Sequence, residues 1–110
     1  MSSIGHSASR PLRDYGRGQI LANFPGHLVR EFGLEAGAEL AFDDGHIYLD
    51  PENAPCYAPT RRLRRQSGEF VVNIPETVVD ERELDDNHAI DYRKPADRRI
   101  PYAFQEARDD

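Results

Sequence analysis

The chain contains the same sequence pattern twice, and this repetition constrains its fold more than any other feature. Residues 18–29 read GQILANFPGHLV, and residues 68–79 read GEFVVNIPETVV. Laid over each other without a gap, residues 18–42 and 68–92 are identical at six positions and largely coincide in their apolar positions. The identical pairs are Gly18/Gly68, Asn23/Asn73, Pro25/Pro75, Val29/Val79, Glu31/Glu81 and Leu34/Leu84. The pattern predicts an internal duplication in which each copy is one supersecondary unit.

Each copy reads as strand, turn, strand, short helix, turn and hairpin. Pro25 stands where a helix can begin, because the first helical position needs no backbone N–H. Gly33 follows an apolar helical pattern and is placed to end the helix in the left-handed conformation. Asp44 and Gly45 predict a tight turn between the last two strands. The strands expected in the first copy cover residues 10–15, 19–24, 39–42 and 47–49.

The second copy follows the same plan with less regular turns. Glu83 stands where the first copy has Gly33, and Asn87 stands where it has Gly37. Because asparagine tolerates positive φ better than most residues other than glycine, we expect Asn87 to take over the role of Gly37. The second copy is therefore the diverged one.

A unit of this size is too small to bury a core alone, and an isolated hairpin pair is marginal in water. It would also expose unpaired strand edges. Two such units can close on each other about a two-fold axis, as single-unit chains would do by forming homodimers. We therefore predict a mainly β fold with short helices, a β-barrel built from two tandem repeats in one chain.

Five segments are expected along the chain. The polar N-terminus and the polar tail are expected to be disordered or frayed, and a segment with three prolines in ten residues reads as a linker. The segments are a disordered N-terminus at 1–9, a first repeat at 10–50, a linker at 51–59, a second repeat at 60–104 and a tail at 105–110.

The stretch GEFVVNIPETVVDERELDDNHAIDYR, at residues 68–93, resembles the SpoVT/AbrB swapped-hairpin family, which includes the N-terminal domains of MazE-like antitoxins. The shared pattern is a basic strand, glycine, an apolar strand, Ile-Pro, a short helix, leucine, a turn and an apolar hairpin. The stretch GRGQILANFPGHLVREFGLEAGAELAFDDGHIYLDP, at residues 16–51, matches the pattern at least as well.

The resemblance implies a swapped-hairpin β-barrel that binds double-stranded DNA, as transcription regulators and antitoxins do. Members of the family commonly contact DNA through arginines of the first strand and of the turn after it. By position, these would be Arg13 and Arg17 in the first repeat, and Arg61, Arg62, Arg64 and Arg65 in the second. Because side chains alternate along a strand, only some of each set can face DNA.

Charge is distributed unevenly along the second repeat. Residues 60–68 carry four arginines and no acid, whereas residues 76–92 carry seven acids and one arginine. This polarity predicts one positive surface on a negative body. The planar fork of arginine suits phosphate and guanine better than lysine does. The alternative is that these arginines pair with neighbouring acids on the surface.

The whole chain is acidic, with 20 Asp and Glu against 14 Lys and Arg, and Lys94 is its only lysine. This composition is typical of a salt-loaded cytoplasm and predicts a haloarchaeal source; codon bias in a GC-rich genome is the alternative. In molar salt the Debye length falls to about 3 Å. DNA binding would then depend on close arginine contacts rather than on long-range attraction.

The residues show no pattern for catalysis, a metal or a cofactor. The four histidines are scattered and Cys56 is the only cysteine, so no metal-ligand spacing occurs. We expect no enzymatic activity, no metal and no cofactor. Without an apolar run near 18 residues or an apolar segment at the N-terminus, we also expect no membrane span and a cytoplasmic, nucleoid-associated location.

The leading hypothesis is a sequence-specific transcription regulator, with further pairing into a homo-oligomer, a dimer of pseudo-dimers, left open. One alternative is an adaptor that kept the barrel and binds a protein partner instead of DNA. Another is the antitoxin of a toxin–antitoxin pair. That role usually needs a disordered C-terminal segment to wrap the toxin, and only about six residues follow the last expected strand.

Overall fold

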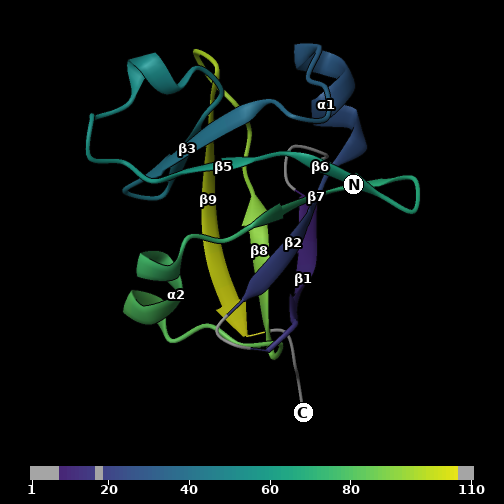
Figure 1. Cartoon of the computed structure of the whole chain (residues 1–110), viewed down its shortest axis with the longest axis vertical. Coiled ribbons are helices and arrows are strands. Elements are labelled where there is room, and N and C mark those ends of the chain that lie inside the picture. Colours follow the sequence, from purple (N-terminus) through teal and green to yellow (C-terminus); the bar gives the residue numbers. More distant parts are fainter. Residues whose placement is uncertain (1–7, 17–18, 107–110) are drawn as a thin grey trace, which may run out of the picture.

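The computed structural model of the chain describes residues 8–16 and 19–106. These residues form nine strands, two short α-helices and one 3-10 helix (Figure 1). The strands are β1 (Ala8–Asp14), β2 (Ile20–Phe24), β3 (Glu39–Asp43), β4 (His46–Tyr48), β5 (Thr60–Arg62), β6 (Arg64–Gln66), β7 (Glu69–Asn73), β8 (His88–Tyr92) and β9 (Arg99–Glu106). The helices are α1 (Gly26–Phe32), α2 (Glu76–Arg82) and the 3-10 helix η1 (Pro51–Asn53), which lies in the segment expected to be a linker.

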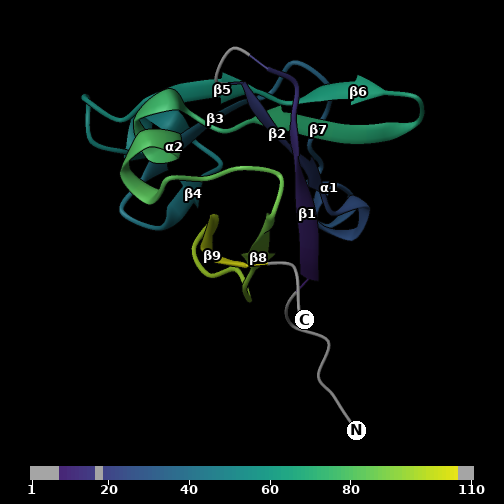
Figure 2. The same ribbon diagram turned by 90° about the horizontal axis from the view of Figure 1, so that it is seen from below.

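All nine strands belong to one antiparallel sheet, in the order β5-β3-β4-β9-β8-β1-β2-β7-β6. Its two terminal strands, β5 and β6, are consecutive in the sequence, with Leu63 alone between them. The sheet therefore curls back on itself into a nearly closed barrel (Figures 1 and 2). The mainly β, barrel-type fold predicted from the sequence is confirmed.

The two predicted repeats are interlaced in this sheet. Residues 12–14 of β1 pair with β2, in the same repeat, whereas residues 8–11 pair with β8 of the other repeat. In the second repeat, β6 pairs with β7 and β5 pairs with β3 of the first repeat. The ladders β2–β7 and β4–β9 also join the repeats. The strands of one repeat are thus completed by those of the other.

The register of the β2–β7 ladder has an approximate two-fold symmetry. Its central pair is Ala22 and Val72, which are fifty residues apart and occupy the same position in the two repeats. On one side Leu21 pairs with Asn73, and on the other Asn23 pairs with Val71. Exchanging the repeats turns each of these pairs into the other. A duplicated chain would produce this register; the duplication, like the division of the chain into segments, stays a prediction.

The first strand of the second repeat is shifted by one residue relative to the rest of that repeat. Arg13 lies opposite Leu21, and Arg64 lies opposite Val71. Arg64 therefore corresponds to Arg13. The sequence separation between these two arginines is one residue greater than the fifty residues that separate Leu21 from Val71. The difference falls in the turn after the strand, where the first repeat is longer by one residue.

The two helices begin and end alike. Each has seven residues, follows a proline and ends at a residue in the left-handed conformation. That residue is Gly33 (φ 65°) after α1, as predicted, and Glu83 (φ 52°) after α2. The prediction of a positive φ for Asn87 is wrong. Its N–H instead donates to Oδ1 of Asp85 at 2.9 Å, so a side-chain hydrogen bond closes this turn without left-handed backbone.

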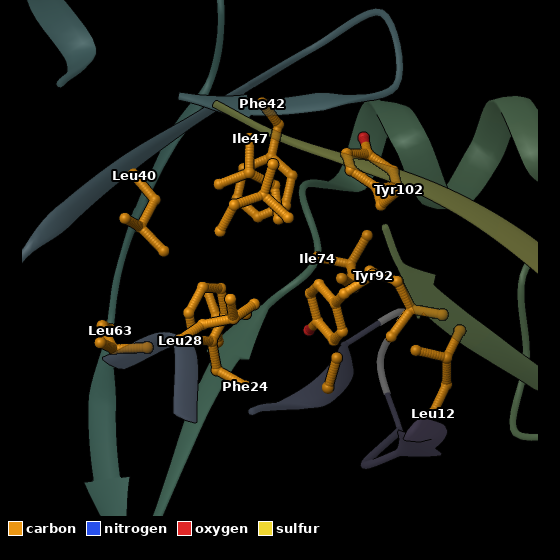
Figure 3. Packing of buried hydrophobic residues seen from close by; sticks show 14 of the residues in the cluster. Leu12, Phe24, Leu28, Leu40, Phe42, Ile47, Leu63, Ile74, Tyr92 and Tyr102 are labelled. Atoms are coloured by element: carbon orange, nitrogen blue, oxygen red, sulfur yellow. The ribbon is translucent and has the colours of Figure 1, made fainter. Parts of the chain in front are cut away.

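The core lies between the facing sides of the barrel and takes residues from both repeats (Figure 3). Phe24 of the first repeat packs edge-to-face on Tyr92 of the second, with ring centroids 5.4 Å apart. Phe42 packs in the same way on Tyr102, at 6.0 Å. Both aromatic pairs cross between the repeats, so the two repeats share one core.

Candidate nucleic-acid interface

The outer face of the strands β1, β2, β7 and β6 presents the candidate arginines. Leu12, Ala22 and Val72 pair across these strands and are all buried in the core. Residues one position along each strand point to the opposite side of the sheet. Arg13 and Asn23 therefore lie on the outer face.

Two rows of side chains cross this outer face, and the two-fold relation exchanges them. One row runs from Arg13 through Leu21 to Asn73. The other runs from Arg64 through Val71 to Asn23. Each row thus has a guanidinium at one end, an aliphatic side chain in the middle and an amide at the other end. The two arginines stand at corresponding positions on either side of the approximate axis.

The two arginines have different neighbours. Nη2 of Arg64 donates to Oδ1 of Asn73 at 2.8 Å. Nη2 of Arg13 lies 3.7 Å from Oε1 of Glu69, with about half of each side chain exposed. Nδ2 of Asn23 also donates to Oε1 of Glu69. Arg64 is therefore held by a neutral amide, whereas Arg13 is partly neutralised by a carboxylate.

The other predicted arginines are spread over more than one surface. Arg62 is exposed and, with Arg64, flanks the buried Leu63, which places both on the outer side of the barrel. Arg61 is partly buried, lies opposite the buried Leu40, and donates to the carbonyl oxygen of Thr60 at 2.7 Å. Its pairing with Leu40 points it toward the inner side of the sheet.

Arg65 lies over the ring of Phe70, with Cζ 5.5 Å from the ring centroid. Within residues 8–16 and 19–106, no carboxylate approaches Arg61, Arg62, Arg64 or Arg65 within 4.0 Å. In the described part of the chain, these four arginines therefore do not pair with acids, contrary to the alternative interpretation of the sequence. Arg17 lies outside the described residues. The structure thus brings Arg13 and Arg64 to the outer face of β1, β2, β7 and β6, places Arg62 at the end of the preceding strand β5, and sets Arg61 and Arg65 apart.

Sequence reasoning missed the two asparagines of this face. Asn23 and Asn73 are one of the six identical pairs in the alignment of the repeats, and a polar residue repeated within an apolar strand was the available signal. Tyr92 supports one of them from inside, since its hydroxyl donates to the carbonyl oxygen of Asn23 at 2.9 Å. Burial raises the pKa of the Tyr92 phenol, which keeps it protonated as a donor.

Among the described residues, no group of three or more His, Cys, Asp or Glu side chains is arranged to hold a metal ion. No helix in the same residues is long and apolar enough to cross a membrane.

Comparison of the chain with models of known protein families, with curated proteins and with solved structures gives no match.

Proposed function

We propose that the chain is a DNA-binding transcription regulator of the SpoVT/AbrB type, in which two tandem swapped-hairpin repeats make a single-chain pseudo-dimer. The proposal assigns DNA contact to the outer face of β1, β2, β7 and β6. Arg13 and Arg64 are the arginines assigned to it, together with Arg62 at the end of the preceding strand β5.

The observation that carries the proposal is the two-fold relation between Arg13 and Arg64. A DNA duplex has local two-fold symmetry, and proteins with a matching axis read (pseudo)palindromic sites. A ribbon of strands fits the major groove, where arginine pairs with guanine and asparagine with adenine through two hydrogen bonds each. The rows from Arg13 to Asn73 and from Arg64 to Asn23 offer one side chain of each type to either half of such a site.

The charge of the face fits close contact rather than general attraction. The chain carries a net charge of −6, so its overall field repels a polyanion. Arg62 and Arg64 are exposed and without a carboxylate partner among the described residues. Guanidinium groups of this kind can make bidentate contacts with phosphates and bases, and such contacts remain effective when salt screens long-range forces.

The test is a titration of the protein onto random-sequence and genomic duplexes across a salt series. We expect log K to fall linearly with log salt, with a slope of about −0.9 for each phosphate neutralised. The triple variant Arg13→Ala, Arg62→Ala, Arg64→Ala should weaken binding and flatten the slope. Asn23→Ala and Asn73→Ala should instead reduce the preference for the best-bound genomic duplexes over random-sequence DNA.

The matched control is Arg82→Ala, which removes an exposed arginine from α2, away from the outer face. It should leave both the affinity and the slope unchanged. Failure to bind any duplex at any salt, or equal losses in the control and the triple variant, would contradict the proposal.

The adaptor that binds a protein partner is favoured by one observation, the carboxylate of Glu69 beside Arg13. A surface selected for DNA alone gains nothing from this negative charge. Under that alternative, no duplex binds and the triple variant loses a protein partner instead. The same titration therefore separates the two functions.

A further inference from the structure

Three arginines line a single cavity whose rim includes Asn23 of the outer face. The cavity has a volume of about 330 Å³ and lies between α1, β1 and the β6–β7 hairpin. Arg10 comes from β1, Arg30 from α1 and Arg65 from β6. Figure 2 shows these elements side by side. Three segments far apart in the sequence thus deliver a guanidinium to the same place.

The three guanidiniums have no carboxylate within 4.0 Å in the part of the chain that the structure describes. Arg10 donates to the carbonyl oxygen of Ser9 at 3.0 Å, and Arg65 lies over the ring of Phe70. Glu69 is the one acid in the lining, and it is engaged by Asn23 and Arg13. The cavity therefore carries an excess of positive charge in a chain that is acidic overall.

The symmetry-related end of the barrel, which carries α2, has the opposite charge. Helix α2 repeats α1 at an offset of fifty residues, so Glu76 stands in place of Gly26 and Asp80 in place of Arg30. Asp14 lies opposite Ile20 as Arg65 lies opposite Phe70, so Asp14 stands in place of Arg65. Of the three arginines only Arg10 has a basic counterpart, Arg61, at the matching place in its ladder.

Gly26 has a particular role in this contrast. A methyl group built at Gly26 would lie 3.5 Å from Nη1 of Arg30, which shows that the guanidinium folds back over this glycine. A glutamate at this position, as in the second repeat, would pair with that guanidinium and enter the cavity. The glycine thus leaves Arg30 free and the cavity open.

We propose that this cavity binds the phosphate group of a small molecule no larger than a mononucleotide. Arginine forks hold phosphate oxygens by paired, charge-assisted hydrogen bonds. The volume is at the low end of the range for small-molecule sites. Phe24 and Phe70 give the lining an apolar side, on which the non-phosphate part of the ligand packs. The site lies at the end of the barrel that carries α1 and has residues of both repeats in its lining, and it does not depend on the proposed DNA contact.

The test is calorimetric titration of the full-length protein with pyrophosphate and with AMP, at fixed ionic strength. We expect saturable binding of at least one of the two probes. Arg30→Asp and Arg65→Asp, which introduce the charges found at the equivalent positions Asp80 and Asp14, should each weaken binding by about tenfold or more. Gly26→Glu should abolish it, while Gly26→Ala adds only a methyl group in ordinary contact and should have a small effect.

The variant Arg82→Ala is again the matched control, because it removes an exposed arginine from the other helix. Circular dichroism and the urea midpoint of each variant show that it is folded. Binding of neither probe, or binding that Arg30→Asp and Gly26→Glu leave unchanged, overturns the proposal.

DNA affinity measured on the same variants distinguishes the source of the phosphate. We expect Arg30→Asp to lose pyrophosphate and AMP while keeping its affinity for duplex DNA. We expect Arg64→Ala to do the reverse. A loss of DNA binding in Arg30→Asp without any binding of the small probes would assign the cavity to backbone phosphates and overturn the proposal. A protein that binds pyrophosphate but no DNA would refute the proposed function alone.

Discussion

The hydroxyl of Tyr92, in β8 of the second repeat, donates a 2.9 Å hydrogen bond to the carbonyl oxygen of Asn23, in β2 of the first. The ring of the same tyrosine packs edge-to-face on Phe24. One buried side chain therefore ties the strand that carries Asn23 to the opposite repeat. The outer face is supported from within the core.

Tyr92→Phe should lower the free energy of unfolding by about 1–2 kcal/mol, because a buried carbonyl oxygen loses its donor. Urea denaturation followed by circular dichroism at constant salt measures the change. The control is Tyr57→Phe, since Tyr57 is 77% exposed, and it should change stability little. Equal stability of the two variants would contradict the role of the hydrogen bond.

Leu63→Ala should destabilise the protein by about 2–5 kcal/mol, the usual range for a buried leucine. Leu63 is fully buried between β5 and β6. Its N–H donates to the carbonyl oxygen of Ala38 at 2.8 Å, and its own carbonyl accepts from Gly37 at 2.6 Å. Leu63→Met conserves the volume and should cost less than about 1.5 kcal/mol. If the alanine variant is no less stable than the methionine variant, Leu63 does not close the barrel.

Glu83→Gly should raise the free energy of unfolding by about 1 kcal/mol, because a left-handed residue with a side chain is strained. Glu83 has φ 52° at the end of α2, where α1 has glycine. The melting temperature measures the gain. The matched variant Asp80→Gly, inside the same helix, should instead lose a few tenths of a kcal/mol. A loss of stability in Glu83→Gly would contradict the explanation by backbone strain.

Stability should fall as the pH rises from about 10 to about 12. Burial raises the pKa of the Tyr102 phenol to about 12, whereas an unfolded tyrosine ionises near pH 10. The unfolded chain therefore releases a proton that the folded chain keeps, so the stabilisation is complete below about pH 10 and is lost as the pH rises through the folded pKa. Tyr102→Phe should move the alkaline unfolding midpoint to higher pH. Ultraviolet difference spectra against that variant follow the ionisation of Tyr102 in the folded protein. Ionisation near pH 10 would contradict this prediction.

Glu69→Gln should tighten binding to duplex DNA, if the proposed function is correct. The substitution removes the charge that lies 3.7 Å from Arg13 but keeps the shape of the side chain. We expect a gain of about two- to tenfold at low salt, which shrinks as salt screens the charge. Glu106→Gln, at the exposed end of β9, is the control and should have little effect. No gain in Glu69→Gln would show that Arg13 does not contact DNA.

The sequence was sufficient to predict the strands of the first repeat to within two residues and the place of both helices, because local patterns carry this information. The break between β5 and β6 at Leu63 was not predicted. Proline before a helix, glycine after it and Asp-Gly in a turn act within a few residues of chain. Asp44 and Gly45 indeed take positive φ values of 49° and 79°. The barrel could be predicted as well, since the repetition of a unit too small to fold alone implies closure.

The candidate site was harder to predict, because its positions depend on register. The alignment at a fixed offset of fifty does not show that Arg64 corresponds to Arg13, since one residue is missing from the intervening turn. Nor does it show that Arg61 and Arg65 leave the outer face, which follows only from their partners Leu40 and Phe70 in the ladders. The cavity of Arg10, Arg30 and Arg65 gathers three distant segments and leaves no local signal.

The interlacing of the repeats also determines when the molecule can fold. Strand β1 is synthesised first, but half of its ladder is with β8, which leaves the ribosome only after most of the chain has been made. Contacts between such distant residues form slowly, because a long loop must close before they add stability. The nascent chain must therefore keep β1 unpaired along one edge until synthesis is almost complete. During that interval, this edge is the point at which a chaperone or another nascent chain would engage it.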